Sequence, residues 1–242
     1  MNGVLRRVAR FVAGRLMPRR PYKVLKGPMK GARLVLGSLS GKGGGATAYF
    51  GEMEPRQTAA MAAEIRPGNV VFDIGANVGY YTILASRVAG PSGKVVAFEP
   101  LLRNIEFLRR HVELNNAANV VVMPVALSDT TGSARFSIGD NSAVGHIGSD
   151  GEIEVETTTV DAVIERLGFI PDVMKIDVEG AEKAVLTGAQ GMFERVKPTI
   201  FLSTHSDELR EWCTNYLVGL GYLVAKVALD GDPHELVARY AV

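Results

Sequence analysis

The sequence is poor in cysteine and has no long apolar run, and each absence excludes a class of protein. Cys213 is the single cysteine in 242 residues, which excludes internal disulfides and metal clusters held by several cysteines. No apolar run approaches the length that a membrane-spanning helix needs. Apolar residues still make up 47% of the chain, enough for one domain to bury a full core. The composition is therefore typical of a cytoplasmic enzyme.

Acidic residues are absent from residues 1–51, which hold 11 lysines and arginines. The rest of the chain holds 16 basic and 26 acidic residues, so the net charge of +1 hides a strong asymmetry. Apolar residues recur at helical spacing near the start, with arginines between them: Val4, Leu5, Val8, Phe11, Val12 and Leu16. Such a helix either packs on a catalytic domain or lies on an anionic membrane surface, and an arginine-rich transit peptide is a third alternative. We predict a basic extension at residues 1–50, of which residues 1–20 could contact a membrane peripherally, and one domain at residues 51–242.

Strand and helix patterns alternate from Val70 onward, which predicts an α/β domain with a mostly parallel sheet. Short apolar runs predict five parallel strands, at residues 70–73, 95–98, 120–123, 173–176 and 199–202. Helices between the strands are expected to end near Ala89, Asn115, Gly168 and Leu220. The turn signal at residues 230–233 separates two further strands, which implies an antiparallel terminal pair. Residues 132–156 are rich in glycine and serine and predict a hairpin insertion.

The stretch from Asp73 to Thr82 predicts a strand end, a glycine turn and the start of a helix. Gly75 and Gly79 allow backbone amides to approach a ligand closely, and the helix N-terminus favours negative charge. These glycines do not follow the Gly-x-Gly-x-x-Gly spacing of dinucleotide sites. Asp73 adds a carboxylate, which repels a pyrophosphate and attracts the sulfonium and ammonium groups of S-adenosylmethionine. We therefore expect S-adenosylmethionine rather than NAD as the cofactor.

Further polar residues in the turns extend this prediction. Glu99 follows the second strand, where a carboxylate can accept both ribose hydroxyls of a nucleoside. Asn77 is expected to contact the methionine part of the cofactor, and Ser128 and Asp129, after the third strand, the adenine. Each residue also has a plainer interpretation: Asp73 as a helix cap, Asn77 in a left-handed turn, and the others as ordinary turn or strand-end residues.

Catalytic candidates follow the fourth and fifth strands. Asp177 stands where the methyl group and the acceptor should meet, and His205 is the one histidine expected at a strand end that faces the cofactor. Either could act as general base for an alcohol. The plainer interpretation makes Asp177 an N-cap and places Glu179 and Glu182 in the first helical turn. A catalytic metal is not required by the chemistry, although Asp177, Glu179, Glu182 and His205 could together bind magnesium.

An ordered set of motifs resembles the FkbM family of S-adenosylmethionine-dependent methyltransferases over roughly residues 49–228. The motifs are Gly51–Pro55, Val71–Thr82, Phe98-Glu99-Pro100, Ala126–Asp129, Thr158–Asp161 and Lys175–Glu182. The resemblance implies a class I methyltransferase with a doubly wound, Rossmann-like, mostly parallel seven-stranded sheet and an antiparallel last strand. It also implies methylation of hydroxyl oxygens in sugars, polyketides or other natural products. In one departure, the family often has Glu-x-His after the fifth strand, where this chain has Ser203-Thr204-His205.

Three functions are compatible with these patterns. The first is O-methylation of a small molecule, a sugar or a lipid-linked glycan. The second is a nucleotide-dependent oxidoreductase, which Asp73 and the missing dinucleotide glycines disfavour. The third is a non-catalytic cofactor-binding protein, to which Ser203 alone points. Nucleic acid is not an expected partner, because the acidic domain offers no basic track. Covalent attack of a cysteine on a pyrimidine ring is also not expected, because Cys213 lies in a predicted helix away from the strand ends.

Overall fold

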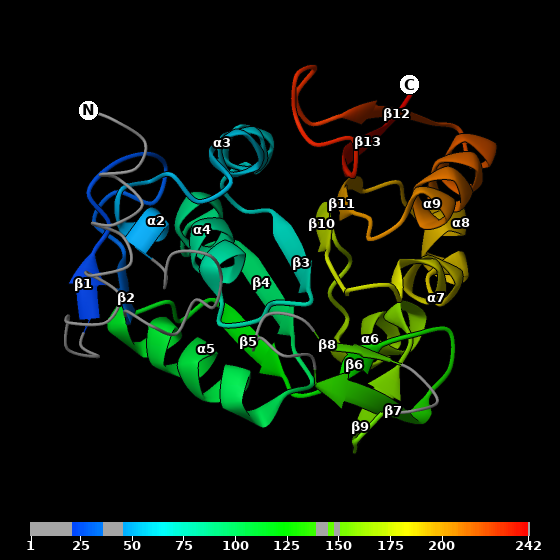
Figure 1. Cartoon of the computed structure of the whole chain (residues 1–242), viewed down its shortest axis with the longest axis horizontal. Helices are drawn as coiled ribbons and strands as arrows, with labels where there is room; N and C mark the ends of the chain where they lie inside the picture. Colours follow the sequence, from blue (N-terminus) through cyan, green and yellow to red (C-terminus); the bar gives the residue numbers. More distant parts are fainter. Residues whose placement is uncertain (1–20, 36–45, 139–144, 148–150, 242) are drawn as a thin grey trace.

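The computed structural model describes residues 21–35, 46–138, 145–147 and 151–241, so the predicted amphipathic helix at residues 1–20 lies outside the described part. The main sheet has seven strands in the order β12-β13-β11-β10-β3-β4-β5 (Figure 1). Their bounds are β3 (Val70–Ile74), β4 (Lys94–Phe98), β5 (Val120–Met123), β10 (Val173–Ile176), β11 (Thr199–Ser203), β12 (Tyr222–Lys226) and β13 (Glu235–Tyr240). Strands β11, β10, β3, β4 and β5 pair in parallel, and β13 runs antiparallel to both of its neighbours. The predicted class I fold with an antiparallel last strand is confirmed.

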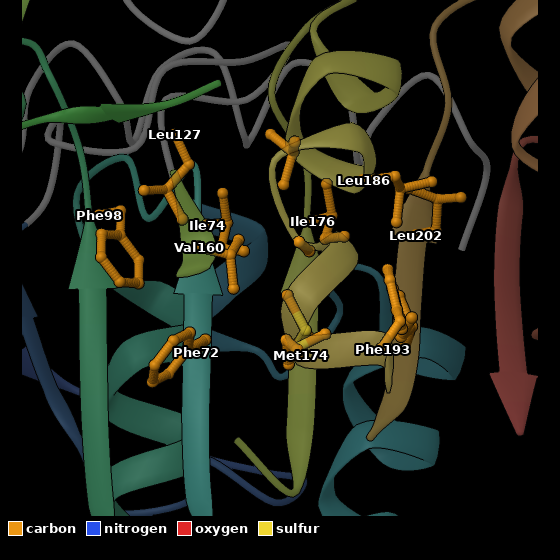
Figure 2. Close-up of a cluster of buried hydrophobic side chains, with 14 of the residues drawn as sticks. Phe72, Ile74, Phe98, Leu127, Val160, Met174, Ile176, Leu186, Phe193 and Leu202 are labelled. Carbon is orange, nitrogen blue, oxygen red and sulfur yellow. The ribbon is translucent and has the colours of Figure 1, made fainter. Parts of the chain in front are cut away.

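Strand side chains alternate between the two faces of the sheet, and each face packs against its own set of helices. On one face, Phe72, Met174 and Leu202 belong to a buried cluster with residues of four helices (Figure 2). These helices are α6 (Val160–Leu167), α7 (Glu182–Thr187), α8 (Gln190–Arg195) and α9 (Asp207–Gly219). The apolar strand runs in the sequence therefore form one half of the core here.

The opposite face carries α3 (Pro55–Glu64), α4 (Tyr80–Ala89) and α5 (Leu102–Leu114). The hairpin of β1 (Pro21–Lys23) and β2 (Arg33–Val35), with the short α2 (Ala46–Tyr49), lies on the same side (Figure 1). Leu34 and Tyr49 join Val71 in this buried cluster. The backbone N–H of Val35 also donates to His111 of α5 at 2.9 Å. The described part of residues 1–50 thus shares a core with the predicted domain.

The predicted insertion forms more than a hairpin. Strands β7 (Gly132–Ile138), β8 (Gly145–Ile147) and β9 (Ile153–Thr158) combine with β6 (Ala126–Leu127) in a four-stranded sheet ordered β6-β9-β7-β8. Strands β7 and β9 pair antiparallel, as a hairpin requires, and β6 pairs parallel with β9. The insertion is therefore fixed to the segment that follows β5.

Within the described ranges, no helix combines the length and apolar character needed to cross a membrane.

Polar side chains interrupt the α3/α4 face of the sheet near the carboxyl ends of its strands. Asp73 and Lys175 are register partners on β3 and β10, and Ser203 and Glu235 are partners on β11 and β13. Alternation places the first three of these on the same face as the apolar residues two positions earlier. A row of ionisable and hydroxyl groups therefore lies where an open α/β sheet binds ligands.

Candidate active site

A groove with two lobes lies at the carboxyl ends of β3, β4 and β10. The lobes share Gly75, Asn77, Asp177 and Glu179 in their linings. One, which we call the Glu99 lobe, is further lined by residues that include Glu99, Asn104, Leu127 and Phe136. The other, the Asp73 lobe, is further lined by residues that include Glu54, Asp73, Tyr81 and Lys175. Residues that line both lobes therefore lie along the same edge of the sheet.

The turn after β3 depends on glycine at two positions. Gly75 and Gly79 have φ angles of +80° and +90°, a left-handed conformation that glycine adopts without strain. A Cβ atom on Gly75 would lie 1.9 Å from the backbone oxygen of Asp177, and one on Gly79 would lie 2.4 Å from Cδ1 of Leu108. Gly75 therefore allows the turns after β3 and β10 to touch beneath the groove. Gly79 is the N-cap of α4 and packs against α5 rather than lining the groove.

Glu99 is held in place by hydrogen bonds from its own chain. Its Oε2 accepts from the backbone N–H of Asn77 at 2.8 Å, and its Oε1 accepts from Leu101 N–H at 3.0 Å and from Asn104 Nδ2 at 3.2 Å. Burial raises the pKa of Glu99, and these hydrogen bonds oppose the rise. A carboxylate offers about four accepting positions, so Oε2 keeps one for a ligand hydroxyl. Asn77 has a φ of +51°, so it does occupy a left-handed turn position while it lines both lobes.

Asp73 is fully buried within β3 and does not cap α4, contrary to its plainer interpretation. Its Oδ2 accepts the hydroxyl of Thr82 at 2.5 Å, whereas Oδ1 has no hydrogen-bond partner among the described residues. Burial raises the pKa of Asp73, and the neighbouring Lys175 ammonium opposes the rise. A buried carboxylate oxygen without a donor is costly. The lobe therefore fits a ligand that brings a positively charged donor.

Lys175 is a buried cation that the sequence interpretation gave no role. Its Nζ lies 2.8 Å from Asp177 Oδ2 and 4.7 Å from the centre of the Tyr81 ring. Burial lowers the pKa of Lys175, but the carboxylates of Asp177, Asp73 and Glu54 outweigh this effect and raise the pKa above its usual range. Lys175 is therefore charged. The sequence signal was a lysine inside an apolar run that forms a central strand, where a charge requires partners.

His205 and Asp177, the two predicted catalytic residues, are brought together. His205 Nδ1 lies 2.7 Å from Glu182 Oε1, and its Nε2 lies 3.2 Å from Glu179 Oε2 and 3.6 Å from Asp177 Oδ1. Burial lowers the pKa of His205, but the hydrogen bond to Glu182 and the charges of Glu179 and Asp177 raise it to about 9. His205 is therefore protonated at neutral pH until a ligand changes its surroundings.

The plainer interpretation of the segment after β10 is wrong for two of its three carboxylates. Helix α7 begins at Glu182 with Ala181 as its N-cap, so Asp177 caps no helix and Glu179 lies before the helix, with a φ of +52°. Ligand atoms of Asp177, Glu179 and His205 lie within 4.8 Å of one another, a geometry that the magnesium alternative requires. Glu182, the fourth residue of that alternative, accepts hydrogen bonds from the Gly180 N–H and from His205.

Ser128 and Asp129 do not line the groove, although the sequence predicted contact with adenine. The backbone N–H of Ser128 donates to Thr158 in the small sheet, and a Cβ atom on Gly188 would lie only 2.1 Å from the Ser128 oxygen. Asp129 is exposed to solvent. The adjacent residues Val125, Ala126 and Leu127 line the Glu99 lobe instead, together with Phe136 from the insertion. Pairing of β6 with β9 turns Ser128 toward the small sheet.

Comparisons with known proteins agree with this geometry. Residues 73–224 match the Methyltransferase FkbM domain. The chain is similar to hexuronic acid methyltransferase AglP of Haloferax volcanii, with 30% identity over 56% of this chain and 56% of that protein. It is also similar to 31-O-demethyl-FK506 methyltransferase FkbM of Streptomyces tacrolimicus, with 28% identity over 52% of this chain and 62% of that protein. The match thus spans less than two thirds of the length of either relative.

A solved structure supports the fold. The methyltransferase FkbM from Methylobacillus flagellatus KT superposes with a TM-score of 0.54 and 18% identity, covering 80% of this chain and 54% of that one. The domain match covers more than half of the present chain. The buried Asp73 oxygen, which has no donor among the described residues, and the Glu99 lobe fit a cationic nucleoside. From the groove and the domain match together, we conclude that S-adenosylmethionine is the cofactor and that the chain belongs to the FkbM family of methyltransferases.

Proposed function

We propose that this chain transfers a methyl group from S-adenosylmethionine to a hydroxyl oxygen of a sugar, a lipid-linked glycan or another natural product. The observation that best supports the proposal is that Asp177 and Glu179 belong to both lobes of the cofactor groove and also contact His205. One relative is named for a 31-O-demethyl acceptor and the other for a hexuronic acid. Both names are compatible with an oxygen-rich acceptor.

The linings of the two lobes favour one orientation of the cofactor. Glu99 retains an accepting position for a ribose hydroxyl, and Leu127 and Phe136 offer apolar walls to the adenine. The Asp73 lobe then receives the methionine part, whose cationic groups meet Asp73. When bound, S-adenosylmethionine supplies a methyl group that its positive sulfur has already activated. The protein must then hold the acceptor oxygen at attack distance, beside the residues shared by both lobes.

A neutral alcohol must lose its proton as the new bond forms, and His205 is placed to accept it. With Nδ1 donating to Glu182, the neutral tautomer of His205 leaves Nε2 free to take a proton on the side of Asp177 and Glu179. The pKa of His205 is about 9 in the ligand-free protein. A sulfonium in the groove disfavours a second positive charge nearby and should lower this pKa, which prepares His205 to act as a base.

The proposal is tested first by calorimetric titration with S-adenosylmethionine, S-adenosylhomocysteine and NADH. Binding of both adenosyl ligands and not of NADH is expected. Methyl transfer from labelled S-adenosylmethionine to a panel of hydroxylated acceptors then tests the reaction. Replacement of His205 by alanine should lower turnover and leave the affinity for S-adenosylhomocysteine nearly unchanged. A folded protein that binds neither adenosyl ligand would overturn the proposal.

A further inference from the structure

Tyr81 lies between two hydrogen-bond acceptors at the wall of the Asp73 lobe. Its hydroxyl oxygen is 2.6 Å from Glu54 Oε2 and 2.7 Å from Gln57 Oε1. A phenol has one hydrogen to donate, so it can satisfy one of these acceptors. The orientation of the Gln57 amide is fixed from the other side, because its Nε2 donates to the Glu235 carboxylate and to Ser203 Oγ. Glu54 therefore receives at most one hydrogen from Tyr81 and keeps several accepting positions at the lobe.

Negative charge exceeds positive charge in this lobe. Its described lining contains the carboxylates of Glu54, Asp73, Asp177 and Glu179 and a single cation, Lys175. The ammonium of Lys175 is already engaged, at 2.8 Å from Asp177 and over the Tyr81 ring. Asp73 Oδ1 is fully buried and has no donor within the described part of the chain. A ligand with one more cationic donor would therefore supply the hydrogen bond that Asp73 Oδ1 lacks and would offset part of the excess negative charge of the lobe.

We propose that Glu54 is a further cofactor-binding residue, whose carboxylate binds the α-ammonium group of the methionine part jointly with Asp73. This inference rests on the proposed function, because it takes the methionine part to lie in the Asp73 lobe. Glu54 reaches the lobe from the segment just before α3, whereas Asp73 belongs to the sheet. An ammonium with three hydrogens can bridge the two carboxylates. Glu54 is solvent exposed in the ligand-free chain, so an incoming ligand can reach it.

The test compares S-adenosylhomocysteine with its desamino analogue, which carries hydrogen in place of the ammonium. For the Glu54→Gln variant we expect roughly tenfold weaker binding of S-adenosylhomocysteine by calorimetry, because a hydrogen bond between two charged groups is replaced by a neutral one. Affinity for the desamino analogue should stay within about twofold of that of the wild-type protein, since no ammonium is present to lose a partner. A Glu54→Asp variant keeps the charge on a shorter side chain and should retain part of the preference for S-adenosylhomocysteine over the desamino analogue.

Glu106→Gln serves as the matched control, because Glu106 lies on the exposed surface of α5 and outside both lobes. It should bind both ligands as the wild-type protein does. Unchanged binding of S-adenosylhomocysteine by Glu54→Gln, or an equal loss for both ligands, would overturn the role of Glu54 and leave the proposed function standing. A wild-type protein that binds neither ligand would overturn both.

Discussion

The two lobes of the groove are built in opposite ways. In the Glu99 lobe, the carboxylate accepts from three donors of its own chain and keeps one accepting position, and the remaining walls include Leu127 and Phe136. In the Asp73 lobe, carboxylates outnumber cations, and one buried oxygen lacks a donor among the described residues. The carboxylate of the first lobe has most of its hydrogen bonds without a ligand, whereas the buried carboxylate of the second lobe lacks a donor that a ligand can bring. This difference matches a cofactor that is a neutral nucleoside at one end and carries cationic groups at the other.

The largest expected effect comes from Gly75, which both lobes share. Gly75→Ala should lower the free energy of unfolding by about 3 kcal/mol or more, because the added Cβ meets the Asp177 oxygen and the left-handed φ is strained. Denaturant unfolding measures the loss. Gly168→Ala is the matched control, since Gly168 is also left-handed at φ +70° but has nothing within 4 Å of an added Cβ. Gly168→Ala should cost about 1 kcal/mol. Equal losses of unfolding free energy in the two variants would show that the close approach of the Asp177 oxygen to Gly75 does not add to the destabilisation.

Asp73→Asn should weaken S-adenosylmethionine binding by about 100-fold, or about 3 kcal/mol, because it removes a buried charge that faces the cationic end of the cofactor. Binding calorimetry checks this. Glu99→Gln should cost only about tenfold, since a single accepting position is offered to the ribose. Equal losses at the two positions would contradict the contrast between the lobes.

The mostly parallel sheet and the meeting of Asp73, Glu99, Asp177 and His205 could be predicted from the sequence, because parallel strands bring their carboxyl ends to one edge, whereas the order of the strands was not predicted. The roles of other residues could not. Lys175 is identified as a partner of Asp73 only once the register between β10 and β3 is known.

Residues brought in from outside the strand ends were the hardest to predict. Phe136 enters the Glu99 lobe from the insertion, whose pairing with the rest of the chain leaves no local pattern in the sequence. The same pairing directs Ser128 away from the groove. Glu54 lies just before α3 and belongs to a motif of the FkbM resemblance, yet its contact with Tyr81 is a tertiary one.

The pH dependence of activity should test whether His205, which lies beside the shared residues Asp177 and Glu179, is the proton acceptor. The pKa of His205 is raised from 6.5 to about 9, so its stabilisation of the fold is complete below pH 6.5 and is lost as the pH rises through 9. The value of kcat/KM, which reports ionisations of the ligand-free protein, should change in the opposite sense and rise as His205 loses its proton. A pH series of kcat/KM in the wild-type protein, with His205→Ala as the variant lacking the base, measures this. A kcat/KM that is flat from pH 6 to 9 would remove His205 from proton transfer.

The smallest expected effect is at Glu235, whose hydrogen bonds reach the Asp73 lobe through Gln57 and Tyr81. Glu235→Gln should weaken S-adenosylhomocysteine binding by about two- to threefold, because Gln57 loses a charged partner but keeps Ser203.

Burial first, then the charge of Glu54, raises the pKa of Glu235 to about 7. The folded state therefore holds a proton that the unfolded chain releases between pH 4.5 and 7, so this carboxyl destabilises the fold as the pH rises through that window. Unfolding measured at pH 5 and pH 8 should show Glu235→Gln gaining stability relative to the wild-type protein at the higher pH. If the difference in stability does not change with pH, the pKa of Glu235 is not raised in the folded protein.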